Sequence, residues 1–240
     1  MSRAAQGIYK FFFSEKQQWA MVTSKQVWAM SLVIKSLIAA GAVAIWLFSQ
    51  KLLGKRNQKH AGAIHDSVHK FTDKINATLQ HHPWGSRALL ISSSLIVDAL
   101  GIFLIASALL GPSIRPLFGL FFLFALRQIN QVITVLPTPE GMIWKDPGFP
   151  SLFVTYGVSN DLFFSGHTAL AVFGALEVAS LGGPLFTALA IFIVIYEVIT
   201  VLLLRAHWTM DVFAGAVTAL WMFTVAEKFS PAIDQWLTQF

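Results

Sequence analysis

The chain is 240 residues long; 55% of the residues are hydrophobic, and only 12% are Asp, Glu, Lys or Arg. An ordinary soluble domain carries about 25% of these charged residues. The composition therefore excludes that class and predicts an all-α polytopic membrane protein, folded as one domain over residues 1–240. Because the chain has no cysteine, disulfides and thiolate chemistry are excluded as well. The net charge is +5, and we expect the basic residues to face anionic lipid headgroups. We expect no nucleic acid as a partner.

Six apolar segments are predicted to cross the membrane as a helical bundle, since a crossing takes roughly 20 mostly apolar residues. The fourth segment is short, and Gly182-Gly183-Pro184 predicts a tight helical hairpin between it and the fifth. In chain order the segments are about 27–49, 86–110, 115–136, 166–181, 184–204 and 209–227.

Two further segments are predicted to lie at the membrane surface as amphipathic helices. The first, at about 8–19, combines aromatic residues with lysines. The second, at about 60–82, gathers apolar residues on one helical stripe and places most of its charges elsewhere. An alternative is that this second helix packs its apolar face on the bundle, which also leaves it outside the bilayer. Its apolar stripe consists of Ile64, Val68, Phe71, Ile75 and Leu79.

Six crossings place both chain ends on one face of the membrane and the loops at about 50–85, 137–165 and 205–208 on the other. Most of the candidate catalytic and phosphate-binding residues lie in two segments, 161–168 and 205–211. These segments are therefore expected to meet. More lysines and arginines follow the first crossing than precede it. This small excess favours a cytoplasmic position for the face that carries the loops. The sequence does not distinguish an endoplasmic reticulum or Golgi-type membrane from a bacterial inner membrane, and a homo-oligomer stays open.

The segment around His207 predicts a nucleophile. Asp211 lies four residues later at the start of a helix, so the two side chains share one face. The carboxylate can accept the Nδ1–H of the imidazole and support positive charge on the ring, which leaves Nε2 as a nucleophile or base. The alternative is a hydrogen-bonded structural pair, although ionisable groups at a membrane helix usually have a function.

The segment Ser165-Gly166-His167 predicts a phosphate site with an acid–base group. A helix that begins here offers unpaired N–H groups to a phosphate oxygen, and Gly166 lets a ligand approach the backbone. Ser165 can bind phosphate or simply cap the helix. His167 can act as general acid and base near neutral pH.

Two arginines are candidate phosphate ligands. Arg205 can hold two oxygens of a phosphoryl group, or it can anchor a helix end at the interface. Arg127 lies well inside a predicted crossing and should face the bundle interior, beside phosphate or in an ion pair with Asp161 or Asp98.

Aromatic residues near these motifs raise the question of headgroup recognition, because an aromatic cage binds quaternary ammonium by cation–π attraction. The alternative for each is a place in the interfacial aromatic belt. No metal and no cofactor is expected, since His65 and His69 lack the cysteines or carboxylates that would complete a zinc site. The four aromatic residues are Trp144, Tyr156, Phe163 and Trp208.

With these residues placed, the chain resembles the lipid phosphotransferase branch of the type-2 phosphatidic acid phosphatase superfamily. It is most similar to sphingomyelin synthases and plant phosphatidylcholine:diacylglycerol cholinephosphotransferases, over about residues 115–227 and more loosely from 60. Ser165-Gly166-His167 and the pair His207 and Asp211 fit the second and third superfamily motifs. Further matches are Arg127 with Leu136-Pro137-Thr138-Pro139, Asp161 four residues before Ser165, and Arg205-Ala206-His207.

The resemblance implies a ping-pong reaction. His207, oriented by Asp211, would take the phospho-headgroup of a phosphatidylcholine or phosphatidylethanolamine and release diacylglycerol, while His167 carries the proton. A diacylglycerol or ceramide would then accept the headgroup. The chain lacks the Lys and Arg-Pro of the first phosphatase motif and has Val201 where phosphatases carry an arginine, which favours a transferase. A hydrolase of the same architecture and a non-enzymatic lipid-binding scaffold are the alternatives.

Overall fold

The structure, a computed structural model, describes residues 15–53, 64–156 and 162–239. Within these ranges every regular element is a helix, and no strand occurs. The predicted all-α class is therefore confirmed. In chain order the helices are α2 (Glu15–Leu53), α3 (Ser67–His81), α4 (Pro83–Leu110), α5 (Arg115–Ile133), α6 (Gly166–Ala179), α7 (Pro184–Leu203) and α8 (Thr209–Leu237).

Five of the helices are long and apolar enough to cross a membrane: α4, α5, α7, α8 and the part of α2 from Ala29 to Leu52. The chain is thus an integral multi-pass membrane protein, as predicted. The remaining predicted crossing, α6, has only 14 residues, which span about 21 Å at 1.5 Å per residue. A hydrocarbon core is about 30 Å thick, so α6 is shorter than an ordinary crossing, and the sixth crossing stays a prediction.

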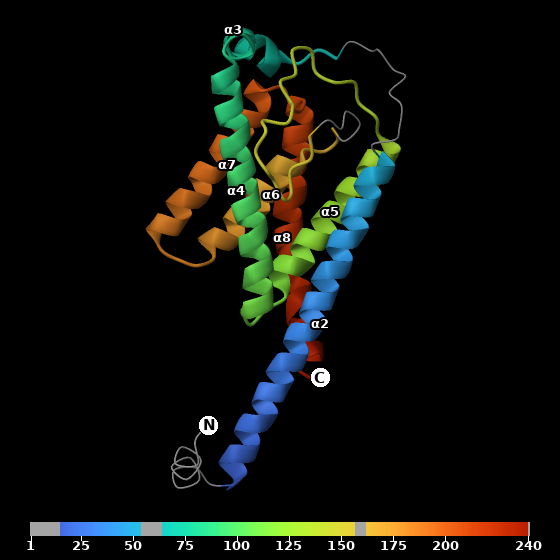
Figure 1. Ribbon diagram of the computed structural model, residues 1–240, viewed down its shortest axis with the longest axis vertical. Helices are drawn as coiled ribbons and strands as arrows, with labels where there is room; N and C mark the ends of the chain where they lie inside the picture. The colour runs from blue at the N-terminus through green and yellow to red at the C-terminus, as the bar shows by residue number, and fades with distance from the viewer. Residues whose placement is uncertain (1–14, 54–63, 157–161, 240) are drawn as a thin grey trace.

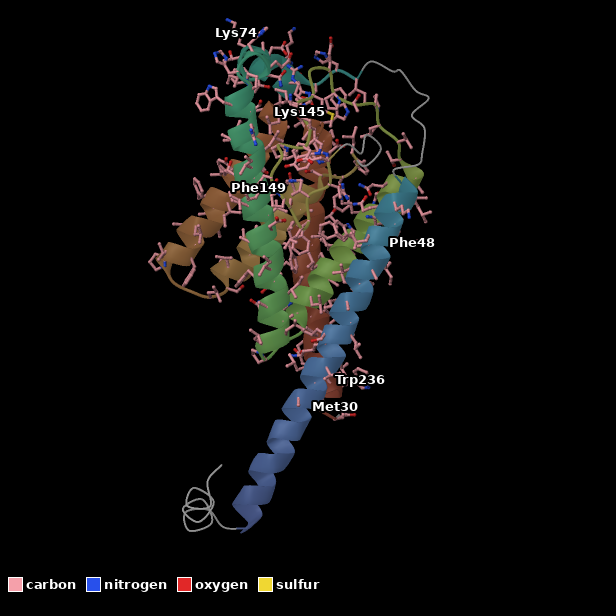
Figure 2. The ribbon with its side chains drawn as sticks, in the orientation of Figure 1. Met30, Phe48, Lys74, Lys145, Phe149 and Trp236 are labelled. Atoms are coloured by element: carbon pink, nitrogen blue, oxygen red, sulfur yellow. The ribbon has the colours of Figure 1, made fainter. Side chains whose placement is uncertain are left out.

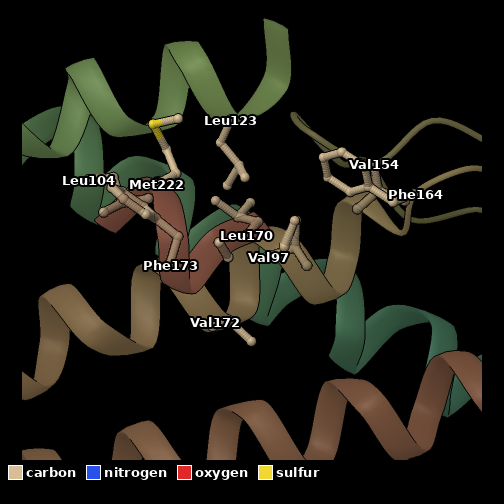
Figure 3. Close-up of a cluster of buried hydrophobic side chains, with 11 residues drawn as sticks. Val97, Leu104, Leu123, Val154, Phe164, Leu170, Val172, Phe173 and Met222 are labelled. Atoms are coloured by element: carbon tan, nitrogen blue, oxygen red, sulfur yellow. The ribbon is translucent and has the colours of Figure 1, made fainter. Parts of the chain in front are cut away.

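Helix α6 is instead the centre of the protein interior. Its side chains are buried along almost the whole helix, and it packs against α4, α5, α7 and α8. Figure 3 shows the core that results, in which Phe173 and Leu170 of α6 meet side chains of the surrounding helices. The body of this short helix is shielded by other helices, whereas the turn that follows it, from Ser180 to Gly183, is exposed. The largest core cluster includes Val97, Leu104, Leu123, Val154, Phe164, Leu170, Phe173 and Met222.

The loops that carry the two motif segments lie at one end of the bundle. In Figure 1, α3 and the connection between α5 and α6 lie at the end opposite to the start of α2 and the end of α8. The starts of α6 and α8 are near each other on this side, because Ser165 and Asp211 share a backbone hydrogen bond. The expected meeting of the two motif segments is therefore found in the structure.

Helix α3 lies across this end of the bundle, where Lys74 marks it in Figure 2. Asp66 caps it by accepting hydrogen bonds from the N–H groups of Val68 and His69. The helix presents its apolar stripe outwards, with Phe71 88% exposed and Ile75 50% exposed, and buries polar side chains against the protein. This orientation favours an interfacial helix over one that packs its apolar face on the bundle. The predicted surface segment at about 8–19 lies outside the described residues up to residue 14, and α2 begins directly after it.

Candidate active site

The two histidine motifs are fixed directly to one another by their backbones. The Ser165 N–H donates a hydrogen bond of 3.1 Å to the Asp211 carbonyl oxygen. Helix α8 approaches the start of α6 closely because Gly215 has no side chain; a Cβ atom there would lie 2.7 Å from the Ser165 carbonyl oxygen. Glycine at this position therefore sets the distance between the motifs.

His207 is held by its Nδ1 atom. This atom lies 2.9 Å from the carbonyl oxygen of Leu162, which can only accept, so Nδ1 carries the proton and Nε2 presents a lone pair. Asp211 Oδ2 is 3.7 Å from Nδ1, beyond hydrogen-bond distance, and accepts the Trp208 N–H at 2.9 Å instead. Asp211 is completely buried, so its carboxyl group lies close to the ring but does not make the expected direct hydrogen bond.

His167 lies at the first turn of α6, whose N-terminus Ser165 caps by accepting the Thr168 N–H at 3.3 Å. Its Nε2 atom is buried and, among the described residues, has no hydrogen-bond partner. The ring meets Trp144 edge to face, with 4.9 Å between the ring centroids. A buried polar atom without a partner is costly, so this nitrogen is available to a bound group.

His167 and His207 line one cavity. Arg127 and Gly166 line it as well, so both histidines, a guanidinium and the start of α6 face the same space. Aromatic, aliphatic and two uncharged polar residues complete the wall. The other lining residues are Trp46, Gln50, Val97, Phe124, Met142, Trp144, Phe153, Thr155, Leu170 and Ala206.

Arg127 reaches the cavity from α5, as the position of an arginine inside a crossing predicted. Its Nε donates to the Phe164 carbonyl oxygen at 3.0 Å, and with its amide oriented to satisfy its hydrogen bonds, Gln50 accepts from Nη1 at 3.3 Å. A Cβ atom on Gly166 would lie 2.9 Å from Nε. The glycine therefore lets the guanidinium rest against the start of α6. Asp98, considered as its partner, accepts hydrogen bonds from residues 151–153, and Asp161 lies outside the described residues.

Arg205 takes a different place from the one that the sequence suggested. Its guanidinium donates to the Glu140 carbonyl oxygen at 2.6 Å and to the His69 carbonyl oxygen at 3.1 Å, and it forms an ion pair with Asp73. It does not line the cavity. In the structure Arg205 thus ties α3 and the loop after α5 to the segment that carries His207, and its role as a phosphate ligand stays a prediction.

Helix α3 contacts the segment that carries His207 from the outer side. His69 Nε2 donates to the His207 carbonyl oxygen at 3.1 Å, and its ring stacks on Trp208 with 5.3 Å between centroids. Asp66 accepts from the N–H and the hydroxyl of Thr209, at 2.7 and 2.8 Å. Burial lowers the pKa of His69, which favours a neutral ring, and a neutral ring with its proton on Nε2 can still donate this bond. From the sequence, His69 was a candidate only as a metal ligand. Its spacing from His65 gives no sign of the hydrogen bond to the His207 carbonyl oxygen.

The four aromatic candidates do not form one cage. Trp144 lines the cavity, and Tyr156 packs on it with 5.0 Å between the ring centroids. Trp208 points elsewhere, since its Nε1 donates to the Pro137 carbonyl oxygen. Phe163 packs beside Phe164 and does not line the cavity. The geometry therefore leaves Trp144 as the aromatic residue of the four that a headgroup in the cavity could touch.

The described part of the chain contains no cluster of three or more His, Cys, Asp or Glu residues that could hold a metal ion. The metal-free site thus stays a prediction, with charge supplied by Arg127 and the N–H groups at the start of α6.

Comparison with known proteins gave one match. The family model AtPDCT1/2 matches residues 65–228, which is more than half of the chain and contains both histidine motifs, α3 and Arg127. The comparisons with curated proteins and with solved structures gave no match.

Proposed function

Because the chain belongs to the AtPDCT1/2 family of plant phosphatidylcholine:diacylglycerol cholinephosphotransferases, we propose that it transfers phosphocholine from phosphatidylcholine to diacylglycerol within the membrane. The observation that carries the proposal is the pair of histidines in one cavity beside Arg127. Each histidine has an Nε2 atom that can act: that of His207 presents a lone pair, and that of His167 has no partner among the described residues.

In the first half-reaction, His207 Nε2 attacks the phosphorus of phosphatidylcholine. A P–N bond forms, the bond from phosphorus to the glycerol oxygen breaks, and His167 gives a proton to that oxygen, so diacylglycerol leaves. The charge that develops on the His207 ring is balanced by the Leu162 carbonyl oxygen on Nδ1 and by the buried carboxylate of Asp211.

In the second half-reaction, His167 removes the proton from the hydroxyl of another diacylglycerol. The oxygen attacks phosphorus, the P–N bond breaks, and a new phosphatidylcholine forms while His207 returns to its starting state. Arg127 and the N–H groups at the start of α6 stabilise the non-bridging phosphate oxygens in both steps. Trp144 offers its ring to the choline cation.

The test uses purified protein in liposomes with phosphatidylcholine labelled in the headgroup and an unlabelled diacylglycerol of different chain composition. We expect label in a new phosphatidylcholine, and none with the His207→Ala variant. Parallel reactions with labelled phosphatidylethanolamine and with ceramide as acceptor define the headgroup and acceptor. Label released only as water-soluble phosphocholine would replace the proposal with a hydrolase, and label that stays in the donor under every condition would leave a lipid-binding role.

A further inference from the structure

A second and larger hollow opens on the side of the bundle between α2, α4 and α5. Almost all of its wall is apolar. Several of its lining residues are exposed on the surface of the bundle, among them Val43 and Ile45 of α2 and Ile129 of α5. The groove is therefore open sideways, towards the region that lipid chains occupy around a membrane protein.

The groove adjoins the cavity of the two histidines, and the side chains between them face both. Trp46, Phe124, Phe153 and Leu170 line both. The rings of Phe124 and Phe153 lie 6.3 and 6.4 Å from that of Trp46, between centroids. Gly101 makes room for this arrangement, because a Cβ atom there would lie 2.5 Å from the Phe153 ring. These aromatic rings mark the boundary between a polar chamber and an apolar one.

One polar side chain stands out in the groove. Gln128 follows Arg127 directly on α5, and consecutive helical positions differ by about 100° around the axis. Arg127 therefore lines the polar cavity, whereas Gln128 lines the apolar groove. Both amide atoms of Gln128 are buried and lack a hydrogen-bond partner within the described ranges. Such an amide is costly in an empty groove and useful if a ligand brings a hydrogen-bonding group to it.

We propose that this groove binds an acyl chain of the substrate lipid, and that Gln128 binds an ester carbonyl or the hydroxyl at its glycerol end. The inference rests on the proposed function for the identity of the lipid, a diacylglycerol or diacyl phospholipid. An ester or hydroxyl oxygen near Gln128 places the adjoining phosphate position on the side of Arg127 and the histidines. The chains remain among apolar side chains throughout, so the lipid reacts without leaving the membrane.

The first experiment maps the chain directly and does not depend on catalysis. Wild-type protein in liposomes is given a diacylglycerol with a photoreactive group at the end of one acyl chain, and the labelled peptides are identified by mass spectrometry. We expect label on the groove segments of α2 and α5, about residues 39–49 and 117–129. Labelling spread evenly over the lipid-facing surfaces of α7 and α8 would overturn the proposal, even if transfer activity is present.

The second experiment blocks the groove. Ala42 lines it, whereas Ala44 on the same helix is exposed and does not, so Ala42→Trp and Ala44→Trp form a matched pair. We expect Ala42→Trp to lower transfer to a long-chain diacylglycerol about ten-fold or more, with a smaller loss for a short-chain one, and Ala44→Trp to leave both rates unchanged. Equal effects of the two variants would overturn the assignment. Absence of transfer in the wild type would count against the proposed function, while the photolabelling would still decide on the groove.

The third experiment separates a ligand-binding Gln128 from a structural one. Gln128→Leu removes an amide without a partner, so we expect the variant to unfold at the same temperature as the wild type or higher. We also expect its KM for diacylglycerol to rise about three- to ten-fold with little change in kcat, as for the loss of one hydrogen bond. An unchanged KM, or a loss of thermal stability, would overturn the role given to Gln128.

Discussion

The start of α6 and the middle of α2 border the same pair of chambers, but they are packed in very different ways. Around α6 nearly every side chain is buried, and the backbones of two motifs are hydrogen-bonded to each other. Between Ala29 and Leu52 of α2 most of the apolar side chains are exposed, for example Phe48 at the edge of the bundle in Figure 2. The two histidines proposed to react thus lie in the tightly packed region, where positions are held closely, and the apolar groove lies beside the loosely packed helix.

The largest effect should come from the histidines of the packed region. We expect His207→Ala and His167→Ala each to lower transfer by about 10³-fold or more, because the first removes the proposed nucleophile and the second the proton carrier. Incorporation of labelled headgroup into new lipid measures this loss. His65→Ala is the control, since His65 is exposed at the approach to α3, and its activity should equal that of the wild type. Substantial transfer by His207→Ala would remove it as nucleophile.

The next effect compares one glycine from each region. A side chain on Gly215 would press on the Ser165 carbonyl oxygen, whereas a Cβ on Gly41 of α2 meets nothing within 4 Å. We expect Gly215→Val to destabilise the protein by about 1–3 kcal/mol, as overpacking does, and to lower activity by separating the motifs. Gly41→Ala should leave activity unchanged. Thermal unfolding in detergent together with transfer rates checks both, and similar behaviour of the two variants would contradict the packing difference described here.

The sequence allowed the helical architecture and the meeting of the motifs to be predicted, because hydropathy and helix counting depend only on local composition. It also located Arg127 correctly, since an arginine deep in an apolar run has to face the interior. It indicated that the fourth apolar segment is short, but not that α6 lies at the centre of the interior, because an apolar helix buried in protein and one exposed to lipid have similar compositions.

The contacts that orient His207 could not be predicted from the sequence, because they involve backbone atoms and distant segments. Leu162 acts through its backbone carbonyl oxygen, which any residue type carries, so no side-chain pattern announces it. The direction of Arg205 depends on α3, which lies more than 120 residues earlier and supplies Asp73 and the His69 carbonyl oxygen. The face of α3 that binds the protein is its polar one, the reverse of what its apolar stripe suggests for packing in water.

An intermediate effect on the transfer rate is expected at His69, which contacts the segment that carries His207 but does not line the cavity. His69→Leu removes the donor to the His207 carbonyl oxygen, so we expect kcat to fall about three- to thirty-fold with little change in KM, since one buried hydrogen bond is lost and its acceptor is left unpaired. His69→Gln can still donate and should recover part of the rate. Equal activity of the Leu variant and the wild type would show that α3 does not position His207.

The smallest effect concerns Asp66 and its dependence on pH. Burial raises the pKa of this carboxyl, but hydrogen bonds from Thr209 and His69 outweigh burial and hold the pKa below its ordinary value of 3.8. A group with a lowered pKa in the folded state stabilises the protein above its unfolded pKa, and this contribution is lost as the pH falls through the folded pKa. Asp66→Asn should therefore unfold at a slightly lower temperature than the wild type at neutral pH. The difference should shrink below about pH 4 and vanish once Asp66 is protonated in the folded protein. A difference that stays constant with pH would mean that the charge of Asp66 does not contribute to holding Thr209.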